Sequence, residues 1–284
     1  MFVTGGSIVY SASDLAAAAR CEYALLREFD AKLGRGPAIS TDRTEDELLA
    51  RTATLGTEHE RRRLDQLRDE FGDGVAVIGR PAYTIAGLTA AAEATQRAIA
   101  GRAPVVYQAA MFDGRFVGFA DFLILDGERY RVADTKLART AKVTALLQLA
   151  AYADALSSSG VEVAPEAELE LGDGTVVRYR IDDLIPVYRA QRTLLQRLLD
   201  RHYAAGSPAR WDDDAILACF RCPLCAEQLR ATDDLLLVAG LRVAQRDKLI
   251  AAGITTITEL ADHNGPVPDL ASAALAKLTA QAKL

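Results

Sequence analysis

The chain has 284 residues, of which half are hydrophobic and a quarter are charged, an ordinary composition for a folded protein with a sizeable core. No apolar run reaches the roughly 18 residues that a membrane span needs. The first ten residues also lack the basic and apolar regions of a signal peptide, so we expect a cytoplasmic protein without membrane contact. The net charge of −6 argues mildly against a nucleic-acid binder, although basic residues can still gather on one face.

The first hundred residues are predicted to be mainly helical. Ser11-x-x-Asp14 has the form of a capping box and should open the first helix. A stretch rich in Glu, Arg and Leu follows and should be ended by Gly72-Asp73-Gly74. The later predicted elements here are one or two helices over 44–71, a short strand over 75–78 and a helix over 85–100.

After residue 104 the sequence becomes strand-like. Asp113-Gly114 and Asp126-Gly127 are strong hairpin signals and predict a three-stranded meander. The predicted elements are strands over 105–112, 115–125 and 130–135, a helix over 142–157, a short strand over 161–163, a hairpin over 168–181 and a helix over 184–203. This order predicts an α/β core with a mixed sheet.

The meander carries two carboxylates and a lysine that suit metal-assisted hydrolysis. Asp121 and Asp134 lie 13 residues apart on strands joined by a tight turn, so they can meet across neighbouring strands. Asp134 and Lys136 are two residues apart and point to the same side of their strand. Carboxylate oxygens bind Mg²⁺, and a nearby cation can orient water or stabilise a developing anion. The alternative is a polar strand end on a solvated face.

Further motifs in the same order make the chain resemble a known family. Gln148-x-x-x-Tyr152 follows the lysine, and Gly56-x-x-His59 precedes the aspartates. With Asp121 and Asp134-x-Lys136, they resemble the motifs of RecB-like nucleases in the PD-(D/E)XK superfamily, and the segment Tyr10–Leu15 with Cys21 resembles that family's first helix. The resemblance implies a restriction-endonuclease-like core, a mixed sheet flanked by helices. It further implies that His59, Asp121 and Asp134 bind Mg²⁺ or Mn²⁺, with the Thr135 carbonyl as an additional ligand, and that Lys136 assists the attacking water. Gln148 and Tyr152 would position DNA or the active-site loop.

Four cysteines indicate a second metal site. Cys219, Cys222 and Cys225 lie close together, and Cys21 lies far upstream. Zinc sites usually use two paired knuckles, whereas three close cysteines and one remote cysteine suit a 4Fe–4S cluster better. The resemblance to AddB-type subunits and CRISPR adaptation nucleases adds to the iron–sulfur interpretation, although the Cys222-x-x-Cys225 spacing is shorter than usual in them. Zinc and free thiols are the alternatives.

The composition changes after the cysteines and predicts a separate helical segment. We expect a nuclease domain over 1–230 and a small C-terminal helical hairpin over 231–284. Gly253 suits a helix end, and Thr255 or Thr256 suits the next helix start. The segment resembles helix-hairpin-helix units, which hold DNA backbone through loop amides and nearby cations such as Arg242 and Arg246. A hairpin that only packs is the alternative.

Together these patterns predict a Mg²⁺- or Mn²⁺-dependent deoxyribonuclease, more specifically an exonuclease acting on single-stranded DNA or DNA ends. Arg139 and Lys142, just after the lysine strand, are candidate DNA contacts. By resemblance, the biological setting is repair or recombination, with further domains or a helicase as partners. The competing hypothesis is a non-catalytic iron–sulfur module of the same fold that binds DNA.

Overall fold

The structure is a computed structural model that describes residues 1–37, 39, 43–211 and 213–284. For residues 43–49 it describes the backbone alone. The chain forms two compact units, one of residues 1–19 and 25–208 and one of residues 20–24 and 209–284. The boundary expected at residue 230 remains a prediction. Among the described residues, no helix combines the length and the apolar character that crossing a membrane requires.

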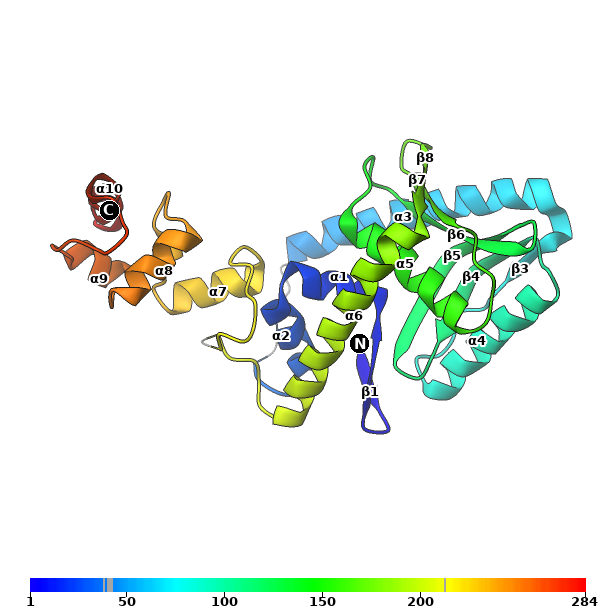
Figure 1. Cartoon of the computed structure of the whole chain (residues 1–284), viewed down its shortest axis with the longest axis horizontal. Helices are drawn as coiled ribbons and strands as arrows, with labels where there is room; N and C mark the ends of the chain where they lie inside the picture. The colour runs from blue at the N-terminus through cyan, green and yellow to red at the C-terminus, as the bar shows by residue number, and fades with distance from the viewer. Residues whose placement is uncertain (38, 40–42, 212) are drawn as a thin grey trace. The chain divides into compact units, whose positions relative to one another are not determined.

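An eight-stranded mixed sheet forms the centre of the first unit (Figure 1). Along its main path the strand order is β1-β2-β5-β6-β7-β8, and β4 pairs with β5 and β3. The pairings of β2 with β5, β3 with β4 and β6 with β7 are parallel, and the others are antiparallel. The strands are β1 Phe2–Thr4, β2 Ser7–Ser11, β3 Val75–Val77, β4 Val105–Phe112, β5 Phe116–Asp126, β6 Arg129–Lys136, β7 Glu166–Leu171 and β8 Val176–Arg180.

Strand β5 has an opening along one of its edges. Strand β4 pairs with one edge of β5 from Val117 to Ile124. The other edge is shared, with β2 at Phe116 and Val117 and β6 from Phe122 onward. Between these two partners, residues 118–121 face no strand of the described chain on that edge. Asp121 lies in this opening.

Helices flank the sheet, as the mixed pattern predicted. Helix α3 packs on β3, β4 and β6, α4 packs on β4, and α5 packs on β4 to β7. Leu64 and Leu67 of α3 join Val105, Phe122 and Ala133 of the sheet in one apolar cluster. The helices up to residue 205 are α1 Ala12–Arg20, α2 Glu22–Lys32, α3 Arg43–Phe71, α4 Ile85–Ala100, α5 Val143–Ser158 and α6 Ile181–Ala205.

The second unit is helical and has a core of its own. Leu235, Leu249 and Leu260 are fully buried at the centre of this core. The expected helix start at Thr256 is confirmed, because its hydroxyl accepts from the backbone N–H of Glu259 at 3.1 Å. The helices here are α7 Pro223–Ala231, α8 Val243–Ala251, α9 Ile257–Asp262 and α10 Ser272–Ala282.

One local expectation differs from the structure, and two strands were not predicted. The short strand expected over 161–163 is a single bridge between Tyr130 and Val163. The sequence patterns also did not indicate β1 and β2, which turn at Gly5-Gly6. Strand β2 is held by a parallel partner more than a hundred residues away, a contact that no local pattern carries.

Candidate active site and cysteine cluster

Asp121 bonds across the opening of β5 to the neighbouring strand β6. Thr135 donates to Asp121 Oδ2 from its backbone N–H and from its hydroxyl, both at 2.8 Å. The β5–β6 ladder ends at Phe122 and Ala133, so the carboxylate serves as the acceptor beyond the last backbone pair. The structure thus brings Asp121 to the strand that carries Asp134, as the short turn between them predicted.

Asp134 and Lys136 form a hydrogen-bonded pair beside Asp121, in which the carboxyl group is buried and the lysine is half-buried. Asp134 is 3% exposed, and Lys136 Nζ donates to its Oδ2. Burial, and then repulsion from Asp121, raise the pKa of Asp134 to about 8 even though Lys136 opposes the shift. The pKa of Lys136 is raised, because Asp134 and Asp121 outweigh the burial that disfavours its charge. A lysine that stays protonated orients a water or stabilises an anion and does not act as a base.

Helix α5 covers this pair with Tyr152. The ring is 6% exposed, and burial with the two nearby aspartates raises the pKa of its hydroxyl. Gly118 leaves room for the ring, since a Cβ there would lie 2.9 Å from Tyr152 Cδ1. Gln148 is half-buried one turn earlier on the same helix. The predicted i, i+4 pair is therefore on the helix that packs over the strands carrying Asp121 and Asp134.

His59 lies on α3 and is 5% exposed. Its Nε2 is buried and has no hydrogen-bond partner among the described residues. A buried ring nitrogen without a partner is costly and suits a metal ligand. In the described chain the four cysteines form a group of ligand atoms close enough to hold a metal ion, and His59, Asp121 and Asp134 do not form a second such group. His59 therefore remains a predicted ligand.

Sequence reasoning missed Glu60, the residue after His59. Its side chain accepts a hydrogen bond from Gln108 Nε2 and is hydrogen-bonded to the Tyr107 side chain. Burial and repulsion from Asp121 raise the pKa of Glu60. The sequence shows only that Glu60 is an ionisable residue next to His59. The contacts of Glu60 with β4 depend on the tertiary fold.

The donor set fits a divalent cation. Asp121 lies beside Asp134, whose charged form is disfavoured by burial and by repulsion from Asp121. A divalent cation compensates both effects, and carboxylate oxygens are the ligands that Mg²⁺ and Mn²⁺ prefer. His59, whose buried Nε2 has no hydrogen-bond partner among the described residues, is a predicted further ligand.

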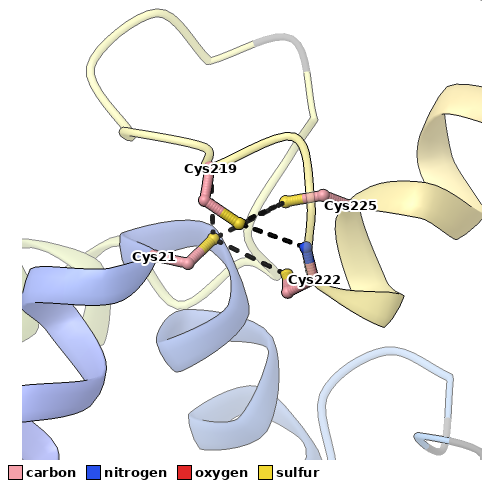
Figure 2. Close-up of side chains that lie close together, drawn as sticks. All are labelled: Cys21, Cys219, Cys222 and Cys225. Atoms are coloured by element: carbon pink, nitrogen blue, oxygen red, sulfur yellow. Dashed lines mark hydrogen bonds between the residues drawn. The ribbon is translucent and has the colours of Figure 1, made fainter.

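The four predicted cysteines meet in the second unit, and none forms a disulfide (Figure 2). Their sulfur atoms all lie within 4.8 Å of one another. Cys21 Sγ is 3.5 Å from Cys225 Sγ and 3.9 Å from Cys222 Sγ, and Cys219 Sγ is 3.9 Å from Cys225 Sγ. The remote Cys21 thus joins the C-terminal run, as its position in the sequence predicted.

Backbone amides point to the sulfur atoms of Cys21 and Cys219. The N–H groups of Arg221 and Cys222 point to Cys219 Sγ at 3.4 and 3.3 Å, and those of Ala24 and Cys219 to Cys21 Sγ, both at 3.4 Å. Burial alone would raise the pKa of Cys219, but the amides of Arg221 and Cys222 and the neighbouring thiols lower it to about 7, whereas burial raises the pKa of Cys222 and of Cys225. A thiol that ionises near neutral pH is ready to bind a metal ion.

The predicted DNA-contacting residues have different surroundings. Arg139 and Lys142 are exposed between β6 and α5, and Arg242 is exposed at the start of α8. Arg246 is bonded instead to Asp234, with Nη2 at 2.6 Å and Nε at 3.0 Å from Oδ2. The guanidinium of Arg246 is therefore engaged within its own unit.

The loop between α8 and α9 has internal acceptors for its backbone amides. Glu259 Oε2 accepts from the N–H groups of Thr255 and Thr256 at 2.6 and 3.1 Å. The carbonyl of Asp233 accepts from the N–H of Ile257 at 2.9 Å. In a DNA-binding helix-hairpin-helix unit, the amides of this loop would donate to phosphate. Here they donate to oxygen atoms of the protein itself.

Comparison with known families agrees with this fold. Residues 10–228 match the PD-(D/E)XK nuclease superfamily, so the match covers most of the chain. The chain belongs to this superfamily of nucleases, which use divalent metals, and its fold is the restriction-endonuclease-like arrangement. No curated protein matches the sequence.

Proposed function

We propose that the protein is a Mg²⁺- or Mn²⁺-dependent deoxyribonuclease that acts on single-stranded DNA or DNA ends, as an exonuclease. The observation that carries the proposal is the meeting of Asp121, Asp134 and Lys136 at the opening of the sheet. A bound divalent cation would supply an activated water and charge stabilisation on the phosphate. The proposed ligands are Asp121, Asp134, His59 and the Thr135 carbonyl.

The other residues of the site are assigned supporting tasks. Lys136, charged at neutral pH, holds the attacking water or stabilises the anion that develops on the phosphate. Gln148 and Tyr152 position DNA or the active-site loop from α5. The exposed Arg139 and Lys142 contact the DNA backbone, which would make binding weaken as salt rises.

Cleavage of end-labelled single- and double-stranded DNA with Mg²⁺ or Mn²⁺ tests the proposal. We expect Asp134→Ala and Lys136→Ala to abolish cleavage. Asp126→Ala is the matched control, since Asp126 ends the same strand as Asp121 with its carboxylate exposed and paired to Arg131. If wild type and the two site variants give the same trace activity, the enzyme hypothesis is wrong and the chain is a non-catalytic module that binds DNA.

For the cysteine cluster we propose an iron–sulfur centre, with a single zinc ion as the alternative. The Cys-x-x-Cys-x-x-Cys run with one remote cysteine favours iron–sulfur. The sulfur separations of 3.5–3.9 Å favour a single tetrahedral ion, because Zn–S bonds of about 2.3 Å place sulfurs about 3.8 Å apart. Anaerobically purified protein that is brown and contains iron supports the cluster, and colourless protein with one zinc per chain supports the ion.

The C-terminal helices are proposed to act mainly by packing. Helix-hairpin-helix binding to DNA is the other hypothesis, but the internal bonding of the Thr255 and Thr256 amides favours packing. DNA affinity measured for Arg242→Ala separates the two, because a phosphate contact predicts weaker binding and a smaller salt dependence. Unchanged binding at every salt concentration would support packing.

The biological setting is proposed from the resemblance to RecB-like nucleases alone. We place the protein in repair or recombination in the cytoplasm, where a reducing environment keeps the four thiols available for metal. A helicase or a further domain is the proposed partner. Co-purification of a DNA-dependent ATPase with the full chain would support that partner.

A further inference from the structure

Gln108 has a backbone conformation that stands apart from the rest of the sheet. Its φ is +55°, and among the described residues it is the only non-glycine strand residue with a positive φ. Side chains with a Cβ disfavour this left-handed region. The β4–β5 ladder is interrupted at the same point, since Tyr107 pairs with Phe122 and Ala109 with Ala120, while Gln108 and Asp121 form no registered pair.

The unusual conformation lets two consecutive side chains reach the same group. Successive side chains of a regular strand point to opposite faces of a sheet. Tyr107 and Gln108 nevertheless both hydrogen-bond to Glu60 of α3. The positive φ at Gln108 is therefore coupled to its bond with Glu60.

Helix α3 bonds to the sheet on both sides of β5 and β6, the strands that carry Asp121, Asp134 and Lys136. Glu60 holds β4 through Gln108. Arg63, one turn later, forms ion pairs with Glu168 at 3.6 Å and Glu170 at 3.2 Å on β7. Strands β5 and β6, which carry the site, lie between β4 and β7 in the sheet.

We propose that Gln108 and Glu60 form a positioning pair that holds Asp121 and the opening of β5 in the arrangement that binds the divalent cation. Gln108 lies directly across the interrupted ladder from Asp121. Glu60 interacts electrostatically with Asp121 and with Lys136, so a shift of this pair reaches both charged partners of the site. Strained backbone at a functional site persists where the surrounding contacts hold it. The inference rests on the proposed metal-dependent nuclease activity and extends it to two residues outside the predicted motifs.

Substitutions at Gln108 separate positioning from a merely structural role. Gln108→Gly removes the bond to Glu60 and also removes the conformational strain, so it should not lower thermal stability. Gln108→Ala removes the bond and keeps the strain. We expect both variants to lower kcat about tenfold with little change in KM, and to weaken Mn²⁺ binding several-fold in calorimetry without DNA.

Two further variants complete the test. Arg102→Gly is the matched backbone control, because Arg102 also has a φ of +55° and its ion pair with Glu128 is exposed. We expect it to keep the wild-type kcat and Mn²⁺ affinity. Glu60→Gln should recover much of what Glu60→Ala loses, since an amide oxygen can still accept from Gln108.

The outcomes decide the proposal even if the nuclease hypothesis fails. If wild-type protein binds Mn²⁺ but cuts no DNA, the Mn²⁺ affinities of the Gln108 variants alone decide whether the pair positions the site. If Gln108→Gly has the wild-type kcat and Mn²⁺ affinity, or changes only the unfolding temperature, the proposal is wrong. If Glu60→Gln is as impaired as Glu60→Ala, Glu60 acts through its charge and the positioning role is overturned.

Discussion

Replacing Gly172 by alanine should disturb the end of β6 that carries Lys136. Gly172 follows β7, and its N–H donates to the Ala138 carbonyl at 3.1 Å. A Cβ at this position would lie 2.8 Å from the Leu137 carbonyl carbon, 3.2 Å from its Cα and closer still to its oxygen. Because these are backbone atoms directly after Lys136, no side chain can rotate away to make room.

The size of the effect follows from the displacement that the Cβ requires. The Leu137 carbonyl carbon must move from 2.8 Å to at least 3.4 Å, an ordinary contact distance. Overpacking of a protein core costs about 1–3 kcal/mol, and we expect a cost in this range at the half-buried Gly172 because backbone must move. Displacements approaching about 1 Å near catalytic groups can reduce rates up to about a hundredfold, so we expect kcat to fall at least about tenfold.

Urea unfolding and Mn²⁺-dependent DNA cleavage measure the two effects. Gly79→Ala is the matched control, because Gly79 is exposed, has an ordinary φ and would place its Cβ in open space. Surface changes of this kind are usually within about 0.5 kcal/mol of wild type. If Gly172→Ala unfolds at the wild-type urea midpoint and keeps the wild-type kcat, the reasoning about this contact is refuted.

Three further predictions concern other parts of the chain. Gly118→Ala should destabilise the first unit by about 1–3 kcal/mol, because its Cβ would lie 2.9 Å from the buried Tyr152 ring. In a chain that also carries Tyr152→Leu, Gly118→Ala should cost less. If unfolding free energies measured in guanidinium are strictly additive for the two substitutions, the contact is contradicted. Burial tends to raise the pKa of Asp113, but backbone N–H groups and Arg192 lower it below its ordinary value. The ionised carboxylate therefore stabilises the folded state above the unfolded pKa of about 4, and this stabilisation is lost as pH falls through the folded pKa. Wild type should therefore lose stability below about pH 4 more steeply than Asp113→Asn in urea unfolding at several pH values, and parallel curves would disagree with this. Cys222→Ser should lower the metal content per chain measured by elemental analysis, and a full complement of metal in this variant would exclude Cys222 as a ligand.

Local patterns predicted the regular elements closely because their causes lie within each segment. The helix over 85–100 and the strand over 105–112 have the bounds that periodicity indicated. The capping box at Ser11 is present, with its hydroxyl and backbone N–H both donating to Asp14 Oδ2 at 2.8 Å. Caps and periodic apolar faces are set by neighbours within a few residues, so they can be inferred without the fold.

The candidate site was only partly accessible from the sequence. The turn between β5 and β6 predicted that Asp121 would meet the strand of Asp134, because neighbouring strands of a short hairpin must lie side by side. Glu60 and Gln108 could not be predicted, since their role depends on a left-handed residue and on the packing of α3 against β4. Strand β2 could not be predicted for the same reason, because its partner β5 is distant in the chain.

The sequence by itself determined the types of chemistry available: two carboxylates and a lysine in a meander, a histidine upstream, and four thiols. Only the tertiary structure decided which groups share a site. It opens the edge of β5 at Asp121, buries Asp134 so that its charge requires a partner, and brings Cys21 within 3.5 Å of Cys225. The physical reason is that burial and charge–charge repulsion depend on what lies nearby in space, which distant segments of the chain supply.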